Sequence, residues 1–342
     1  SLNHSKVNFS TSSVDTILDA GLRANIILPH GCKSGQCGAC IVKLVEGKIK
    51  TSAGDIISSN KKEQNKVLLC QSLAHSELVI IEYPEDVLQK IYTKDKRNQA
   101  IGIREFFVEV VSNRQITPLV SELKVLIPDK LNFKFEAGMH LDFINAKLNL
   151  AKKYSICNTP NSEKKAKNNI LRFLIAKHNK NGLSEYLCDK AYPGNILNIK
   201  GPYNSFIFGN ETEKPILALA GGTGIAPILP ILESKLNKNN TMHVMVILSV
   251  RSRKEILEMD RLYELSQKYS NFAFKVTLTR ENATIGTRFL NGRINKILPK
   301  VFKDLSGHNV FICGSNGFVE NSKKIVVDLK GIEKKIFTEI FS

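Results

Sequence analysis

Four of the seven cysteines in this 342-residue chain have a spacing that suits a metal centre. Cys32, Cys37 and Cys40 are separated by four and two residues, and Cys70 follows after 29 more. Thiolates suit iron–sulfur clusters and zinc, and this spacing is typical of plant-type [2Fe–2S] centres. Small residues between the cysteines let the backbone N–H groups point at sulfur and stabilise an added electron. We therefore expect a [2Fe–2S] cluster, with structural zinc or a thioredoxin-like Cys37-x-x-Cys40 pair as alternatives.

A glycine-rich segment, LALAGGTGIAP, suits a ligand that carries phosphate groups. It places a glycine loop directly after an apolar run and before a helical pattern. Glycines let the backbone approach a pyrophosphate, and the amino end of a helix favours the negative charge. We expect Gly221, Gly222, Thr223 and Gly224 to form this loop.

Two short segments between these patterns, KKYSICNTP and KNGLSEYL, carry groups that suit a cofactor. Tyr154 offers an aromatic face, and Ser155 offers a hydroxyl beside it. The N–H groups of Leu183 and Ser184, after Gly182, can receive a phosphate at the start of a helix. Taken alone, these are weak signals, because Tyr-Ser in a strand is more often ordinary core.

The pattern of apolar runs, turns and helical segments divides the chain into three parts. Residues 1–88 contain short alternating runs, with a hairpin expected around residues 46–48 and a polar linker following. Residues 102–210 contain β-branched and aromatic runs separated by turns, which predicts an antiparallel barrel. Residues 213–342 alternate apolar strands with helices, which predicts a parallel sheet covered on both faces. We expect a multidomain protein of the α+β and α/β classes.

The net charge of +17 is spread along the chain. It amounts to +2 for residues 1–84, +8 for residues 85–210 and +7 for residues 211–342. A nucleic-acid interface concentrates its charge in one patch with interleaved aromatic residues, so we expect no nucleic acid. The excess suits lysine-rich solvated faces, an acidic partner or phosphorylated ligands.

The sequence predicts neither a signal peptide nor a membrane span. The N-terminal residues lack an apolar run behind a basic start, and the apolar stretch 215–232 is interrupted by glycines and prolines. Clustered cysteines in odd total number favour a metal site in a reducing compartment over disulfides. We therefore expect a cytoplasmic protein without a membrane span.

Two families of motifs are recognisable in the first two parts. HGCKSGQCGAC with the later LLC resembles the ferredoxin signature GCxxGxCGxC, which implies a β-grasp domain whose four cysteines bind the cluster. KKYS, the later GLSE and GPYNSF resemble the flavin motifs of ferredoxin–NADP reductase-like enzymes. Lys152 stands where that family has an arginine, so a point charge replaces a bidentate fork. The resemblance implies FAD in preference to FMN.

The third part continues this resemblance. AGGTGIAP resembles the nucleotide loop of the same reductases, and VFICGSNGF resembles their CG motif. This implies that Cys313 and Gly314 help to place the nicotinamide against the flavin. The terminal Glu339-x-Phe341 resembles a Glu-x-aromatic ending, which implies a carboxylate near the flavin and a ring that covers it.

Three arginines bear on the choice of nucleotide. Arg251, Arg280 and Arg293 occupy places where some relatives bind the adenosine 2′-phosphate, and arginine suits that dianion. Glu255 falls in a predicted helix, so no acidic residue clearly awaits a ribose hydroxyl. The pattern favours NADPH slightly, and surface arginines in an NADH enzyme are the alternative.

The order of the motifs resembles a fused iron–sulfur flavoprotein reductase. Relatives of this type are reductase components of aromatic-ring and phenol oxygenases and the CDP-6-deoxy-glucoseen reductases, with the N-terminal part most similar to the latter. A nicotinamide gives two electrons as hydride and a [2Fe–2S] centre takes one, so flavin must convert between them. Catalytic roles are implied for Ser155, Cys313 and Glu339. The acceptor is expected to be a dehydratase or oxygenase component with an acidic docking face.

Two other classes of protein stay open. An iron–sulfur redox sensor would hold the cluster yet show negligible turnover. A zinc-binding scaffold would be colourless.

Overall fold

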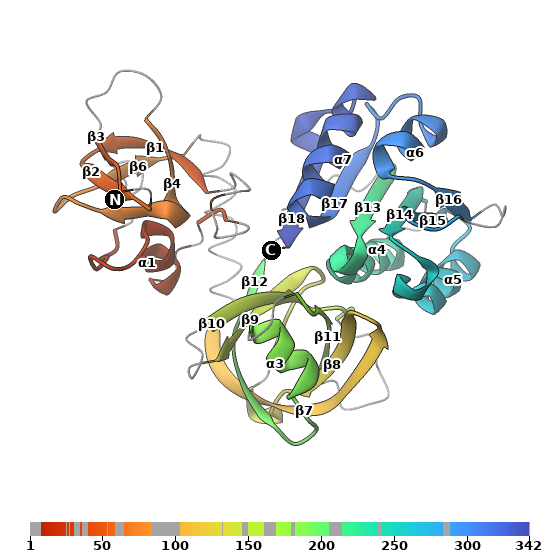
Figure 1. Ribbon diagram of the computed structural model, residues 1–342, viewed down its shortest axis with the longest axis horizontal. Coiled ribbons are helices and arrows are strands. Elements are labelled where there is room, and N and C mark those ends of the chain that lie inside the picture. The colour runs from red at the N-terminus through yellow and green to blue at the C-terminus, as the bar shows by residue number, and fades with distance from the viewer. Residues whose placement is uncertain are drawn as a thin grey trace. The chain divides into compact units, whose positions relative to one another are not determined.

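A computed structural model describes most of the chain, in two compact units that divide at residue 102 (Figure 1). Each unit is described by itself. The described residues are 8–24, 26, 28–30, 35, 40–52, 54–58, 65–83, 103–131, 133–145, 150–160, 169–178, 182–204, 214–238, 241–282 and 288–341. Within these ranges no helix is long and apolar enough to cross a membrane.

The first unit holds one helix and two small antiparallel sheets. Helix α1 (Ile17–Arg23) begins at Thr16, whose hydroxyl accepts a hydrogen bond from the Asp19 N–H at 3.1 Å. The sheets have the orders β4-β1-β6 and β3-β2-β5. Their elements are β1 (Ile41–Glu46), β2 (Lys48–Thr51), β3 (Ile56–Ser58), β4 (Lys66–Leu68), the 3-10 helix η1 (Leu69–Gln71), β5 (Ser72–Ala74) and β6 (Ile80–Glu82).

The hairpin expected around residues 46–48 is wrong. Strand β1 pairs with β4 and β6, whereas β2 pairs with β3 and β5, so the chain changes sheets at Gly47. Gly47 has a φ of 95°, and a Cβ there would overlap the Leu78 carbonyl oxygen. The Ser76 hydroxyl occupies the same corner and accepts the Lys48 N–H at 2.8 Å. Tertiary contacts with residues 76–78 therefore turn a predicted hairpin into a corner.

The second unit starts with the predicted antiparallel barrel. Its strand order is β10-β9-β12-β7-β8-β11, and every pair is antiparallel. The segment after β10 closes the barrel, because the Cys157 N–H donates to the Arg172 carbonyl at 2.8 Å. The elements are β7 (Arg104–Thr117), β8 (Val120–Leu126), η2 (Asp129–Leu131), β9 (Met139–Asn145), β10 (Leu150–Ser155), β11 (Ile170–Ala176), α3 (Leu183–Asp189) and β12 (Ile196–Asn204).

The predicted parallel sheet completes this unit, with strand order β16-β15-β14-β13-β17-β18. Its strands are β13 (Ile216–Gly221), β14 (Val244–Val250), β15 (Phe272–Leu278), β16 (Phe289–Asn291), β17 (Asn309–Ser315) and β18 (Ile336–Phe341). The helices are η4 (Gly222–Gly224), α4 (Ile225–Lys238), η5 (Arg253–Glu255), α5 (Met259–Lys268), α6 (Ile294–Val301), α7 (Asn316–Asp328) and η6 (Glu333–Lys335).

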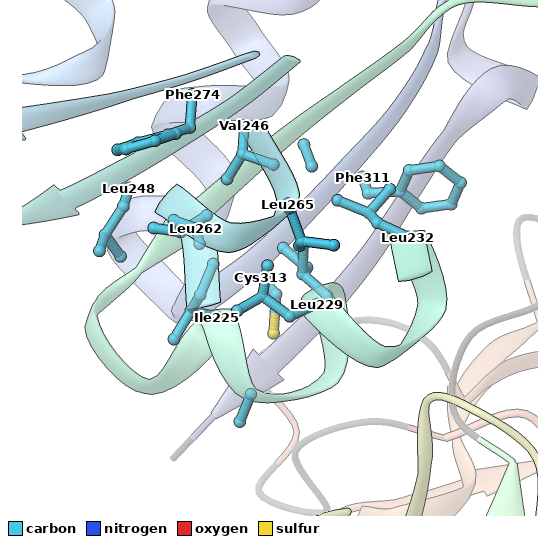
Figure 2. Packing of buried hydrophobic residues seen from close by; sticks show 14 of the residues in the cluster. Ile225, Leu229, Leu232, Val246, Leu248, Leu262, Leu265, Phe274, Phe311 and Cys313 are labelled. Carbon is cyan, nitrogen blue, oxygen red and sulfur yellow. The ribbon is translucent and has the colours of Figure 1, made fainter. Parts of the chain in front are cut away.

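Helices cover both faces of the parallel sheet (Figure 1). Alternate side chains of the strands pack with α4 and α5 into one apolar cluster, and Figure 2 shows Ile225, Leu229 and Leu265 within it. Helices α6 and α7 lie on the opposite side in Figure 1. The predicted α/β layering is therefore confirmed.

The helix predicted from residue 254 begins later than expected. Residues 253–255 form the short 3-10 helix η5, and α5 begins only at Met259. The residue before it, Glu258, has a left-handed φ of 59°. Its carboxylate binds Arg172 of the barrel, so a tertiary contact sets this start.

Candidate functional site

Two of the four predicted metal ligands lie within the described residues, and they lie together. Cys40, just before β1, and Cys70, in η1, are both buried, and their Sγ atoms are 3.2 Å apart. Two thiolates on one tetrahedral metal, with bonds of about 2.3 Å, lie roughly 3.8 Å apart. This pair therefore fits a shared metal ion with a small adjustment. Cys32 and Cys37 fall outside the described residues.

The side chain of Gln71 links Cys70, the fourth predicted ligand, to Ser52 and lies close to Gly35. Its amide Nε2 donates to the Cys70 carbonyl at 3.0 Å, and its Oε1 accepts the Ser52 hydroxyl at 2.6 Å. The same Nε2 lies 3.9 Å from the Cys70 Sγ. Gly35 packs so closely that a Cβ there would lie 2.9 Å from the Gln71 Cγ. Sequence reasoning missed Gln71, whose only signal was its position after the fourth cysteine.

Strand β10 carries the residues predicted to meet the flavin. The Tyr154 ring packs edge-on against Phe143 at 5.4 Å, and burial raises the pKa of its hydroxyl. That Oη is buried and has no hydrogen-bond partner in the described part of the chain. Burial, and after it the charge of Lys152, lower the pKa of His178. A buried hydroxyl without a protein partner on this strand fits an incoming polar cofactor such as FAD.

The predicted phosphate loop precedes α3. Gly182 caps that helix, and Leu183 is buried behind it. Ser184 is also buried, and its hydroxyl accepts the His178 N–H at 3.3 Å. Ser184 therefore fixes the passage from β11 to α3, while Lys152 and His178 supply the polar groups beside it.

A cavity of about 710 Å³ brings most of the predicted nucleotide residues together. Barrel residues 176–178 line the same cavity. The predicted residues that line it are Gly221, Gly222, Thr223, Arg251, Arg280, Arg293 and Phe341.

Three predicted residues do not line this cavity and instead form tight packing beside it. A Cβ on Gly224 would overlap the Cys313 carbonyl oxygen. A Cβ on Gly314 would lie 2.9 Å from the Phe318 ring and 3.2 Å from the Gly221 Cα. These glycines allow the loop to lie directly against β17, which is a different use from contact with the ligand.

An acidic residue does face the nucleotide cavity, contrary to the expectation from sequence. Glu255 lines the cavity because η5 replaces the predicted helix. Its carboxylate accepts the Arg251 N–H at 3.1 Å and pairs with the Arg251 Nε at 3.0 Å. One of the three arginines is therefore already neutralised.

The ends of β17 and β18 place Cys313 beside Glu339, since the two residues are register partners. Cys313 is fully buried among residues such as Ile225 and Leu229 (Figure 2). Burial raises the pKa of its thiol well above the ordinary value, the Glu339 carboxylate adds to this, and Lys153 opposes it. The Lys153 ammonium lies 3.7 Å from a Glu339 carboxylate oxygen. Lys153 was missed in the sequence, because it occupies the variable position of Lys-x-Tyr-Ser.

A second set of charges joins the barrel to α4 and α5. Arg172 of β11 forms a fork on Glu258 and also binds Glu122 of β8. Arg261 binds Glu233 of α4 and Glu258, at distances from 2.5 to 3.2 Å. Burial alone would raise the pKa of Glu258, but hydrogen bonds and charge from the arginines outweigh it and hold the pKa below its usual value.

Comparison with known proteins agrees with this arrangement. Two family models match the chain, "2Fe-2S iron-sulfur cluster binding domain" over residues 1–75 and "Oxidoreductase NAD-binding domain" over residues 218–324. The reductase component of propane 2-monooxygenase from Gordonia sp. (strain TY-5) is 25% identical over 96% of this chain and 92% of its own length. The CDP-6-deoxy-L-threo-D-glycero-4-hexulose-3-dehydrase reductase of Yersinia pestis is 27% identical over 99% of this chain and 97% of its own.

Solved structures show the same fold over the whole chain. The Amycolatopsis cytochrome P450 reductase GcoB has a TM-score of 0.79 at 18% identity and covers 100% of this chain and 98% of its own. The ferredoxin reductase in carbazole 1,9a-dioxygenase has a TM-score of 0.72 at 19% identity and covers 100% and 97%.

These findings define the class of protein. The chain is an electron-transfer oxidoreductase that joins a [2Fe–2S] cluster-binding domain, a barrel with the fold found in ferredoxin reductases and a NAD-binding domain. More narrowly, it is similar over nearly its whole length to the reductase components of oxygenases and to the reductase of a hexulose dehydrase. The resemblance to ferredoxin–NADP reductase-like enzymes is confirmed.

Proposed function

We propose that this reductase takes hydride from NADPH and delivers single electrons to a separate protein. One observation carries the proposal: a single cavity is lined by the glycine loop, three arginines and Phe341 on one side and by barrel residues 176–178 on the other. FAD held by the barrel would supply the two-electron chemistry that hydride requires, and a [2Fe–2S] cluster held by the cysteines would supply one-electron transfer. Each NADPH thus yields NADP⁺, one proton and two electrons for the acceptor.

The residue roles we propose are those that the family motifs imply. Groups on β10 and at the start of α3 would hold and cover FAD, and the chain's own catalytic groups would orient the nicotinamide. The FAD set is Lys152, Tyr154, Ser155, Gly182, Leu183, Ser184 and Phe341. The nucleotide set is Gly221, Gly222, Thr223, Gly224, Arg251, Arg280, Arg293, Cys313 and Gly314. The catalytic set is Ser155, Cys313 and Glu339, and the cluster set is Cys32, Cys37, Cys40 and Cys70.

The charge of the cavity supports NADPH. Arg280 and Arg293 are exposed at its wall, and neither has an acidic partner among the described residues. Arg251 is neutralised by Glu255, so two cationic side chains are available for a 2′-phosphate dianion.

The acceptor we propose is a deoxysugar dehydratase, with an oxygenase component as the alternative. The Yersinia relative is named for a hexulose dehydrase and the Gordonia relative for a monooxygenase, at similar identity over nearly the whole chain. The net charge of +17 supports an acidic docking face on the acceptor. We also propose domain limits of 1–88, 102–210 and 213–342, and a cytoplasmic location where thiolate ligands stay reduced.

The test is the visible spectrum of anaerobically purified protein before and after addition of NADPH. We expect flavin and cluster absorbance, both bleached by the nucleotide. Cys70→Ser should remove the cluster bands and leave flavin reduction intact, because Cys70 belongs to the other unit. A cluster without nucleotide-dependent bleaching would favour a redox sensor, and a colourless protein would contradict the proposal.

The nucleotide preference has its own test. Arg293→Gln should lower kcat/KM for NADPH by roughly 10- to 100-fold, the worth of a charged hydrogen bond, and should change that for NADH little. Glu255→Gln should increase the preference for NADPH by freeing Arg251. Arg114→Gln on the exposed face of the barrel is the control. Equal losses with both nucleotides would contradict a 2′-phosphate site.

A further inference from the structure

Lys153 lies on strand β10, which carries the residues predicted to meet the flavin. Its side chain lies on the opposite face of the strand from those of Lys152 and Tyr154. Along β10, Lys153 pairs with Asp142 and Ser155 pairs with His140 of β9. Alternation of side chains places Lys153 and Ser155 on one face of the strand and Tyr154 on the other. The Lys153 ammonium lies 3.7 Å from Glu339 Oε1, on strand β18 of the parallel sheet.

The contact is made in a desolvated place. The Glu339 side chain is 3% exposed and that of Lys153 is 18% exposed. A buried carboxylate is costly unless a cation or hydrogen-bond donors compensate its charge. Cys313, opposite Glu339 in the sheet, responds electrostatically to both groups, which places all three in one neighbourhood.

The effect of this pair extends to the nucleotide cavity. Glu339 and Phe341 are two residues apart on β18, so their side chains share a face of the strand. Phe341 is the register partner of Ser315, and both of these residues line the cavity. A group that fixes Glu339 therefore also fixes the ring at the cavity wall.

We propose that Lys153 is a positioning residue that holds Glu339, and with it the end of β18, against the barrel strand β10. The inference rests on the proposed function, because a fixed strand end matters for turnover only if hydride crosses between these two domains. Lys153 touches neither nucleotide nor flavin in this role and acts through Glu339.

The test is the rate of flavin reduction at saturating NADPH, measured anaerobically by stopped flow on the whole protein loaded with its cofactors. Lys153→Met should slow reduction about 10- to 100-fold, the cost of an ångström-scale misplacement. We expect the FAD content and the NADPH concentration for half-saturation to change less than about threefold, because the binding groups are untouched. Lys153→Arg should recover most of the rate, and Lys324→Met, on the exposed side of α7, should match the wild type.

A double variant separates positioning from simple loss of structure. Because Lys153 acts through Glu339, Lys153→Met combined with Glu339→Gln should be no slower than the slower single variant. Independent multiplication of the two losses would overturn the inference, as would a loss of rate that only follows loss of FAD. If the wild type reduces its flavin and Lys153→Met equals Lys324→Met, Lys153 has no such role. If the wild type itself is not reduced, the proposed function is the part that fails.

Discussion

The barrel and the parallel sheet are joined by two sets of charges that differ in kind. Near α4 and α5, two arginines and three glutamates form a connected network in which Arg172 grips Glu258 with both arms of its fork. Near the end of β18, the described ion pair is a lysine and a glutamate at 3.7 Å. A guanidinium fork fixes direction as well as distance, whereas an ammonium acts as a point charge.

The two connections should therefore differ in rigidity. We call the arginine network the fixed side and the Lys153–Glu339 pair the adjustable side. The arginine network fixes the two folds at one place, where Leu257 just before Glu258 also lines the cavity. The single pair at the other place lies beside Cys313 and leaves more freedom to the strand end that bears Phe341. We therefore expect the connection made by the arginine network to be the more rigid of the two, and the one made by the single pair to be the more adjustable.

The largest effect should come from breaking the network. Arg172→Ala leaves Glu258 and Glu122 buried without their main partner, so the unfolding free energy of the second unit should fall by about 3–5 kcal/mol. Urea unfolding of holoprotein measures it. Arg114→Ala removes an exposed partner of the same Glu122 and should cost less than about 1 kcal/mol. Equal effects would contradict the contrast between buried and exposed charges.

The network should also set the response to acid. Arginine contacts hold the pKa of Glu122 and Glu258 below the usual range despite burial. Groups with a lowered pKa stabilise the folded state above the ordinary glutamate pKa near 4.3 and lose this as the pH falls through their folded values. Unfolding free energies measured from pH 6 downward should therefore converge for wild type and Arg172→Ala. A gap that stays constant into strong acid would mean that these carboxylates do not carry the effect.

The adjustable side can be disturbed from within the sheet. Gly224→Ala would push a methyl group into the Cys313 carbonyl, so we expect a loss of about 1–3 kcal/mol in stability and weaker NADPH binding. Gly307→Ala is the matched control, because nothing lies within 4 Å of its Cβ position. Thermal unfolding with and without nucleotide compares them. A harmless Gly224→Ala would contradict the close approach of the loop to β17.

The smallest effect compares two fully buried thiols, Cys157 beside the network and Cys313 beside the single pair. Burial raises the pKa of Cys157 to about 12 and raises that of Cys313 well above its usual value, so alkylation requires local opening. Below about pH 8.5, iodoacetamide should therefore modify Cys313 several-fold faster, as followed by peptide mass spectrometry. Above that pH, unfolded thiols ionise while these stay protonated, so stability should decline. Faster modification of Cys157 would reverse the assignment of fixed and adjustable sides.

The sequence was most informative where function depends on neighbours along the chain. The spacing of the cysteines and the loop around Gly222 were recognisable because one short segment supplies three of the four cysteines and another supplies the whole glycine loop. The barrel and the parallel sheet were predictable because their apolar patterns have different periods. These features need no knowledge of distant contacts.

The rest depends on contacts between distant segments. Lys153 reads as one more surface lysine until β18 places Glu339 beside it. Glu255 was assigned to a helix because its pattern is helical, yet the carboxylate of Glu258 is drawn to Arg172 and the helix starts later. A hairpin was likewise predicted at Gly47, but residues 76–78 pack against this glycine and the chain passes there from one sheet to the other. Periodicity alone does not contain these partners.

Glu258 is restricted twice, and this narrows what evolution can place there. Its φ of 59° suits glycine, asparagine and aspartate, whereas the fork of Arg172 requires a carboxylate. Glycine or asparagine at this position would remove the backbone strain but also the ion pair with Arg172. Aspartate would keep the negative charge, on a side chain that is one methylene shorter. Lineages that diverge at this position are therefore expected to change residue 172 with it, so that the two positions are inherited as a unit.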